Sequence, residues 1–289
     1  MIEGESKLTV TIKLLDQMLS FDPQTNENHF LPFALTDVLS EYAGVHHQEF
    51  LHFWQLPDTM ILGMKDTRVP FFDEGIKVLT AAGFQPIIRN SGGLGVINDA
   101  GVLNVSWIFP KALAATTDAA YQRMVDLMHE AFPEKEILAK EIPNSYCPGT
   151  FDLSIDGKKI AGTAQRRIKE GIAVMMYLSV NGLQQQRGEL VKRFYQASLK
   201  EQFGTNGYPA VDPASMTTLQ DALQKPFSVA EAASRLQEAL IQLTKQSISP
   251  VAVSDWITQN KQAALLETRM TSMYQRNQPI KESPNEHSL

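Results

Sequence analysis

The chain has a single cysteine, Cys147, among its 289 residues. One thiol cannot form an internal disulfide, and it cannot build a thiolate metal site alone. Cys147 is therefore a buried filler, an exposed bystander or a nucleophile. The low cysteine content and the absence of a signal-peptide-like hydrophobic run near the N-terminus make the cytoplasm the expected compartment.

Several other features are also missing. No apolar run is long enough to span a bilayer, so we expect no membrane segment. The net charge is −6 and no block of basic residues occurs, which disfavours nucleic-acid binding. The Gly-x-Ser-x-Gly and His-Glu-x-x-His motifs are absent, and the spacing of His46, His47 and His52 does not fit a metal site. We expect no metal and no cofactor.

What is present describes a globular protein with a sizeable core, since 43% of residues are hydrophobic and 20% charged. Apolar runs bounded by turn residues predict strands at 50–56, 60–63, 84–89, 102–109 and 172–180. Helical spacing predicts helices at 71–82 and 117–131, one ending at Gly204, one beginning with a capping box at Ser228 and one starting near Ser254. This mixture predicts an α/β (α+β) fold around one sheet.

We divide the chain into four parts. Residues 1–30 are interpreted as an N-terminal extension and residues 31–250 as the main domain. Residues 251–275 are expected to hold a C-terminal helix. The polar residues 276–289, which contain two prolines, are expected to be disordered.

A hairpin is predicted around Asp156-Gly157, a strong signal for a two-residue turn. The expected pairs, from the turn outward, are Ile155 with Lys158, Ser154 with Lys159, Leu153 with Ile160, and Asp152 with Ala161. Lys159 then lies on a sheet face with small or polar neighbours and room for a ligand. A solvated lysine paired with Asp152 is the alternative.

Cys147 lies just before this hairpin, in the segment Asn-Ser-Tyr-Cys-Pro-Gly. A short loop can bring its thiol within reach of Lys159. A lysine ammonium beside a thiol favours the reactive thiolate and can transfer a proton. Pro148-Gly149 indicates a turn here, although a small buried hydrophobic residue remains the alternative for Cys147.

The segment Arg89-Asn-Ser-Gly-Gly-Leu-Gly-Val follows a predicted strand. Consecutive glycines allow a ligand to approach the backbone closely, and the backbone amides can hold a phosphate or carbonyl oxygen. The segment is neither a Walker loop nor a dinucleotide fingerprint, because the spacing fails for both. Arg89 is a candidate anion contact. A plain turn with a surface arginine is the alternative.

Two segments, 89–93 and 152–162, resemble in order and spacing the hallmark stretches of the lipoate/biotin protein ligase and octanoyltransferase superfamily. The resemblance covers roughly residues 30–230 and implies a mixed central β-sheet flanked by helices. It implies a catalytic role for Lys159 beside Cys147. The substrate-binding residues that it implies are Arg89, Ser91, Gly92, Gly93, Asp152, Ala161 and Gly162.

Residues 146–159 resemble the cysteine-dependent amidotransferase branch, which moves octanoyl groups from the glycine-cleavage H protein. The implied donor is the octanoylated H protein, and the implied acceptors are lipoyl domains of 2-oxoacid dehydrogenase complexes. Cys147 would carry the group as an acyl-thioester. Asn98 stands where ligases commonly have a histidine, and Leu94-Gly95 replaces a Gly-Ala type pair. Both departures argue against ATP-dependent adenylation and against loading from acyl carrier protein.

Lys158, Arg166 and Arg167 make the hairpin region locally basic, and this patch is a candidate docking site for acidic lipoyl-carrying domains. A solvated edge without a partner is the alternative. Three other functions stay open. They are an ATP-dependent lipoate-protein ligase, an acyl-carrier-protein-dependent octanoyltransferase and a non-catalytic module that binds acylated proteins.

Overall fold

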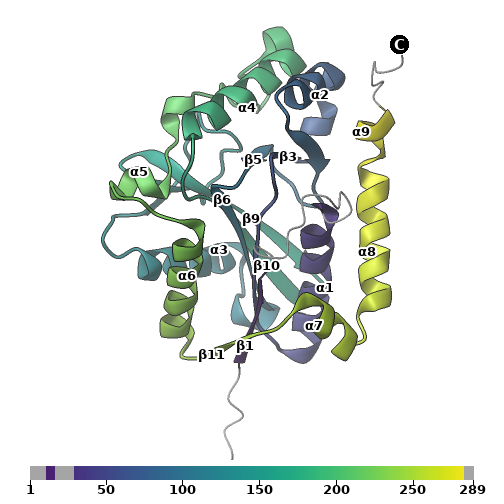
Figure 1. Cartoon of the computed structure of the whole chain (residues 1–289), viewed down its shortest axis with the longest axis vertical. Helices are drawn as coiled ribbons and strands as arrows, with labels where there is room; N and C mark the ends of the chain where they lie inside the picture. Colours follow the sequence, from purple (N-terminus) through teal and green to yellow (C-terminus); the bar gives the residue numbers. More distant parts are fainter. Residues whose placement is uncertain (1–10, 17–28, 283–289) are drawn as a thin grey trace, which may run out of the picture.

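The computed structural model describes residues 11–16 and 29–282. Its centre is a mixed eight-stranded sheet with the strand order β11-β1-β2-β6-β10-β9-β8-β7 (Figure 1). β1 pairs in parallel with β2 and β11, and the other neighbours in this sheet are antiparallel. The strands are β1 (Thr11–Asp16), β2 (Phe50–Trp54), β6 (Val102–Pro110), β7 (Leu138–Ala139), β8 (Leu153–Ile155), β9 (Lys158–Ile168), β10 (Gly171–Ser179) and β11 (Ser247–Pro250).

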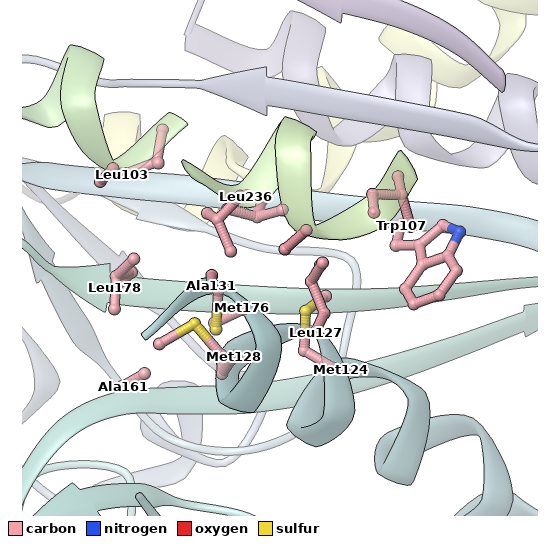
Figure 2. Packing of buried hydrophobic residues seen from close by; sticks show 14 of the residues in the cluster. Leu103, Trp107, Met124, Leu127, Met128, Ala131, Ala161, Met176, Leu178 and Leu236 are labelled. Carbon is pink, nitrogen blue, oxygen red and sulfur yellow. The ribbon is translucent and has the colours of Figure 1, made fainter. Parts of the chain in front are cut away.

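One face of the large sheet is covered by α3 (Thr117–Ala131) and α6 (Val229–Thr244). The apolar stripe predicted for residues 120–131 is buried there, and Figure 2 shows Met124, Leu127 and Met128 packed over β10. The capping box at the start of α6 is confirmed, because Ser228 and Glu231 bond each other's backbone N–H. The short helix α5 (Leu219–Leu223) precedes α6.

The other face carries α1 (Leu31–His46) and a small sheet of order β4-β3-β5. This sheet consists of β3 (Thr59–Leu62), β4 (Gln85–Ile88) and β5 (Val96–Asn98), and it packs with α2 (Phe72–Ala81) and α4 (Gln184–Leu199). α7 (Val253–Gln259) and α8 (Ala263–Arg276) follow, and α8 runs alongside α1 (Figure 1). α1 was not predicted. It is buried on most sides, and even its polar residues Asp37 and Glu41 are covered and paired with cations.

Parts of the predicted organisation differ from the structure. Within residues 1–30, Thr11–Asp16 forms β1 between two strands of the large sheet, so this segment belongs to the main domain. The tail predicted to be disordered includes the helix α9 (Gln278–Glu282). Residues 283–289 of this tail lie outside the described residues. α4 ends at Leu199, and a short 3-10 turn separates it from Gly204.

The hairpin register needs one correction. Ile155 and Ser154 face Lys158 and Lys159 as predicted, but Leu153 faces Ala161 instead of Ile160. A β-bulge between Leu153 and Ser154 shifts the pairing, because two residues of one strand oppose one of the other. The expected pairing of Asp152 with Ala161 is therefore wrong.

Candidate active site

Cys147 lies in the loop between β7 and β8, and it is half-buried. Its φ of 49° is in the left-handed region, which costs a non-glycine residue roughly 1–2 kcal/mol. The Lys159 ammonium offsets this cost by donating to the carbonyl oxygens of Cys147 at 2.8 Å and Tyr146 at 3.0 Å. The unusual backbone conformation is thus held from the neighbouring strand β9.

Lys159 is itself almost completely buried, with 3% of its surface exposed. Its Nζ lies 2.9 Å from Asp152 Oδ1 and 3.3 Å from Ser145 Oγ. Burial raises the pKa of Asp152, and the Lys159 ammonium opposes that shift. The backbone N–H groups of Gly149 and Ile142 also donate to the Asp152 carboxylate. The Cys147 loop, the lysine and the aspartate therefore form one buried polar unit.

The sulfur of Cys147 faces the glycine-rich segment that follows β4. The backbone N–H of Leu94 donates to Sγ at 3.3 Å, and Nη2 of Arg89 lies 3.8 Å from the same sulfur. Gly93 has a φ of 91°, and a Cβ there would lie 2.5 Å from Arg89 Nη2. Only glycine therefore allows the arginine and the loop to meet at the thiol.

A second buried group supports the glycine-rich segment from below. Asp66 accepts from Tyr195 Oη at 2.8 Å and from the backbone N–H of Gly63 at 2.7 Å. The backbone N–H of Gly95 donates to the same tyrosine oxygen at 3.2 Å. Burial raises the pKa of Asp66 to about 6. A Cβ at Gly63 would lie 1.9 Å from the carbonyl oxygen of Gly93, so the two backbones are in close contact.

An apolar pocket opens beside the thiol. Cys147, Arg89, Ser91 and Gly162 line it, and so does a mainly apolar set of side chains further along it. That set consists of Phe33, Trp54, Ile61, Val96, Asn104, Thr163, Ala164, Met175, Met176 and Tyr177. Cross-strand pairing places Gly162, Tyr177 and Asn104 in one row of the large sheet, with Trp54 as the next member.

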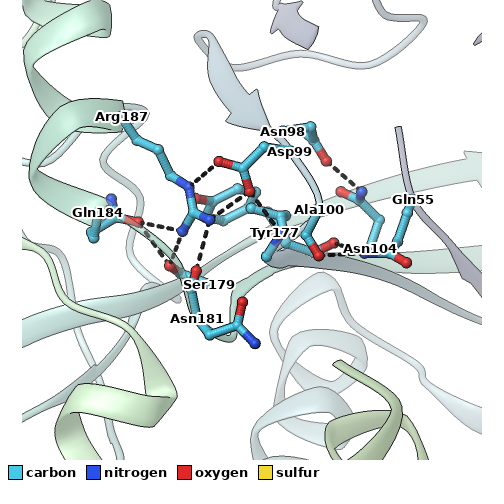
Figure 3. Close-up of polar contacts among 12 residues, drawn as sticks. Gln55, Asn98, Asp99, Ala100, Asn104, Tyr177, Ser179, Asn181, Gln184 and Arg187 are labelled. Atoms are coloured by element: carbon cyan, nitrogen blue, oxygen red, sulfur yellow. Dashed lines mark hydrogen bonds and ion pairs between the residues drawn. The ribbon is translucent and has the colours of Figure 1, made fainter. Parts of the chain in front are cut away.

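A polar network lies behind this row (Figure 3). Arg187 on α4 bonds Asp99 through Nε at 2.7 Å, and its Nη1 donates to Ser179 and Gln184. Gln184 Nε2 donates to Tyr146 Oη, which forms a short hydrogen bond with Tyr177. The network therefore fixes a pocket residue and the residue that precedes Cys147.

The structure brings several predicted site residues together and separates others. Cys147, Arg89, Ser91 and Gly162 share the pocket, with Lys159 and Asp152 adjacent and the exposed Gly92 and Gly93 in the loop beside it. Ala161 packs in the hydrophobic core on the opposite face of the sheet (Figure 2), a consequence of the irregular register. Ala161 does not line the pocket, and its role in substrate binding stays a prediction.

The three basic residues predicted to dock a partner differ in exposure. Lys158 and Arg167 are exposed. Arg166 is held inward, since its Nη2 lies 2.9 Å from Asp37 and its Nη1 donates to the carbonyl of Asn90. In the described part of the chain, no helix is long and apolar enough to cross a membrane.

Several residues of the site were not predicted from the sequence. Leu94 acts through its backbone, and Asp66 and Tyr195 are distant in sequence from the residues that they support. Tyr177 lies in an apolar run that was predicted as a buried strand. The glycines of segment 89–96 were the only sequence feature that indicated a contact from the backbone to the site. They did not show that the N–H of Leu94 makes this contact.

Comparison with known proteins shows the family and the fold of the chain. Residues 28–241 match the family model of the lipoyl protein ligase A/B catalytic domain. Two solved structures share the fold. The structure of lipoate-protein ligase A bound with ATP has a TM-score of 0.67 and 15% sequence identity, and the match covers 92% of this chain and 94% of the other. The structure of a bipartite lipoate protein ligase from Thermoplasma acidophilum has a TM-score of 0.64 and 16% sequence identity, and the match covers 92% of each chain. The fold is that of a lipoate protein ligase.

Curated relatives specify the family further. Three of them are named octanoyl-GcvH:protein N-octanoyltransferase. The protein from Exiguobacterium sibiricum is 41% identical, and the match covers 77% of this chain and 82% of the relative. The Staphylococcus aureus protein is 39% identical with coverages of 78% and 82%, and the Bacillus velezensis protein is 36% identical with 86% of each chain covered. The chain belongs to the lipoyl protein ligase A/B catalytic domain family and groups there with these octanoyltransferases.

Proposed function

We propose that this protein is a cytoplasmic amidotransferase in protein lipoylation. It moves an octanoyl group from a lysine of the octanoylated glycine-cleavage H protein to a lysine of a 2-oxoacid dehydrogenase lipoyl domain. The names of the relatives support the donor and the reaction class. The observation that carries the proposal for this chain is the placement of its single thiol beside an apolar pocket, with a backbone N–H 3.3 Å from the sulfur.

The reaction has two balanced steps. In the first, the Cys147 thiolate attacks the octanoyl amide carbon, a C–S bond forms, the C–N bond breaks, and the donor lysine leaves as an amine after gaining a proton. In the second, the amine of the acceptor lysine attacks the thioester, a new amide forms, and the thiol is released. One amide replaces another, so no ATP is consumed.

The residues around the thiol have separate roles in this proposal. Lys159 holds the Cys147 loop, because its ammonium donates to the carbonyl oxygens of Tyr146 and Cys147. The eight-carbon chain occupies the apolar pocket that Cys147 and Gly162 line. A Cβ at Gly162 would lie 3.2 Å from Lys159 Cε, so this glycine leaves room for the lysine side chain. Asp152 forms an ion pair with the buried lysine.

Intact-protein mass spectrometry tests the proposal. The protein is incubated with octanoylated H protein without ATP, and a Cys147→Ala variant is treated in parallel. We expect one octanoyl adduct on the wild type, which hydroxylamine removes and which is discharged by an added lipoyl domain. We expect no adduct on the variant.

Two outcomes would count against this mechanism. Absence of any adduct on the wild type without ATP would reject the thioester. Full transfer by Cys147→Ser in the presence of ATP and magnesium would indicate a ligase, because adenylation does not require a thiol.

A further inference from the structure

Two cationic side chains reach the Cys147 residue, and they contact different parts of it. Lys159 contacts the backbone carbonyl, whereas Arg89 contacts the sulfur. A nucleophilic thiolate requires positive charge or N–H donors at the sulfur itself. The two cations are therefore not equivalent candidates for stabilising it.

The Lys159 ammonium has no donor left for the sulfur. Its three N–H bonds already face four oxygen atoms, those of Asp152, Ser145, Tyr146 and Cys147, at 2.8–3.3 Å. Moving Lys159 towards the sulfur would take the cation away from the buried Asp152 carboxylate and the donor away from the Cys147 carbonyl, which is costly.

The Arg89 guanidinium can donate to the sulfur. Its Nη2 donates to the carbonyl of Gly92 at 2.6 Å and contacts Cys147 Sγ, and its buried Nε has no hydrogen-bond partner among the described residues. Arg89 is 9% exposed and lines the pocket. A guanidinium keeps its charge at all relevant pH values, so it acts as a constant cation beside the thiol.

The geometry points to Arg89 and the backbone N–H of Leu94 as the pair that stabilises the Cys147 thiolate, with Lys159 acting as a positioning residue for the loop. This assignment rests on the proposed role of Cys147 as nucleophile. It makes Arg89 a catalytic residue that contacts the reacting atom and does not bind only substrate.

Alkylation of the single thiol by iodoacetamide tests the assignment without any acyl substrate. Rates are measured by intact mass from pH 6 to pH 10 for the wild type, Arg89→Gln and Arg89→Lys. Arg193→Gln, an exposed arginine on α4, is the matched control. We expect Arg89→Gln to react about tenfold or more slowly at pH 7 but to approach the wild-type rate near pH 10, where every thiol is ionised. Arg89→Lys should recover part of the rate.

The outcomes are distinct. A wild-type rate for Arg89→Gln at pH 7, or an equal loss at every pH, would overturn the assignment. If Arg89→Gln does not fold by circular dichroism, Arg89→Lys and Gly93→Ala decide, because a Cβ at Gly93 displaces the guanidinium while keeping the charge in the protein. They must lose rate at pH 7 relative to pH 10. If no octanoyl adduct forms on the wild-type protein, the proposed function is rejected. The alkylation rates do not depend on an acyl substrate, so they still test the assignment of Arg89.

Discussion

Asp66 shows how one buried carboxyl can make stability depend on pH. Its pKa is raised from 3.8 to about 6 in the folded protein, because burial disfavours the charged form. The folded state therefore binds this proton more tightly than the unfolded state does. The resulting stabilisation is fully present below about pH 4 and is lost as the pH rises through about 6.

We expect an Asp66→Asn variant to lose this pH dependence. Between pH 4 and pH 7.5, the unfolding free energy of the wild type should fall relative to that of the variant by about 2.5 kcal/mol, because the pKa is raised by about two units. Urea titrations at both pH values measure the difference. Asp58→Asn, at an exposed carboxyl, serves as control. Parallel profiles for the wild type and Asp66→Asn would show that Asp66 does not titrate in this range.

Lys159 allows a second test at the scale of single residues. Lys159→Met leaves the buried Asp152 carboxylate without its cation, which should reduce the unfolding free energy by about 3–5 kcal/mol. The double variant Lys159→Met/Asp152→Asn should recover most of that stability and still lack octanoyl transfer, because the Cys147 loop has lost its anchor. Recovery of transfer in the double variant would mean that the lysine serves only to neutralise the aspartate.

At the scale of elements, local sequence signals predicted much of the fold. The capping box of α6, the apolar stripe of α3 and the turn at Asp156-Gly157 depend on neighbouring residues, and all three are found. The pairing of strands that are distant in sequence was harder to predict. The β-bulge at Leu153 depends on how β8 meets β7 and β9, and the placement of Ala161 follows from it.

The same distinction holds for the site. Cys147, Lys159 and Arg89 were named from their own segments, and the structure brings all three together. The separate roles of the lysine, which holds the loop, and the arginine, which contacts the sulfur, could not be predicted. These roles depend on which atoms of Cys147 each side chain reaches. That choice is set by Asp152 and by the positive φ of Gly93.

The end of α8 contributes to the same region through Asn277. Its side-chain amide accepts from the N–H of Ile88 at 2.7 Å and donates to the carbonyl of Ile88 at 3.0 Å. Ile88 is the last residue of β4, an edge strand of the small sheet, and it immediately precedes Arg89. The helix thus caps a strand edge next to the site.

We expect Asn277→Ala to cost about 1–3 kcal/mol of unfolding free energy, because two buried backbone groups lose their partner. Hydrogen exchange at the Ile88 amide should become faster while exchange in β6 stays unchanged. Gln275→Ala, which removes an exposed amide two residues before Asn277, is the control. Equal protection of Ile88 in both variants would contradict a capping role.

At the scale of the whole molecule, the charge distribution bears on partner binding. The chain carries a net charge of −6, yet Lys158 and Arg167 are exposed towards the two ends of β9. An acidic lipoyl domain that docks there should bind less tightly as salt screens the charges. The acceptor KM should then rise with ionic strength.

A charge reversal provides a direct measurement. Lys158→Glu/Arg167→Glu should raise the acceptor KM with little change in kcat, since neither side chain contacts the thiol. Lys77→Glu/Arg193→Glu, two exposed cations on α2 and α4, gives the same change in net charge elsewhere. Equal KM increases in both double variants would indicate a general effect of net charge and no docking patch.

The pairing of β1 with β11 has a consequence for biosynthesis. β1 is complete at Asp16, but its parallel partner β11 ends at Pro250. At 5–20 residues per second, roughly ten to fifty seconds of translation separate the two strands. During that interval one side of β1 keeps unpaired N–H and C=O groups, which can template pairing with another nascent chain. Crowded polysomes making this protein are therefore where we expect aggregation to begin, before any complete chain has been released.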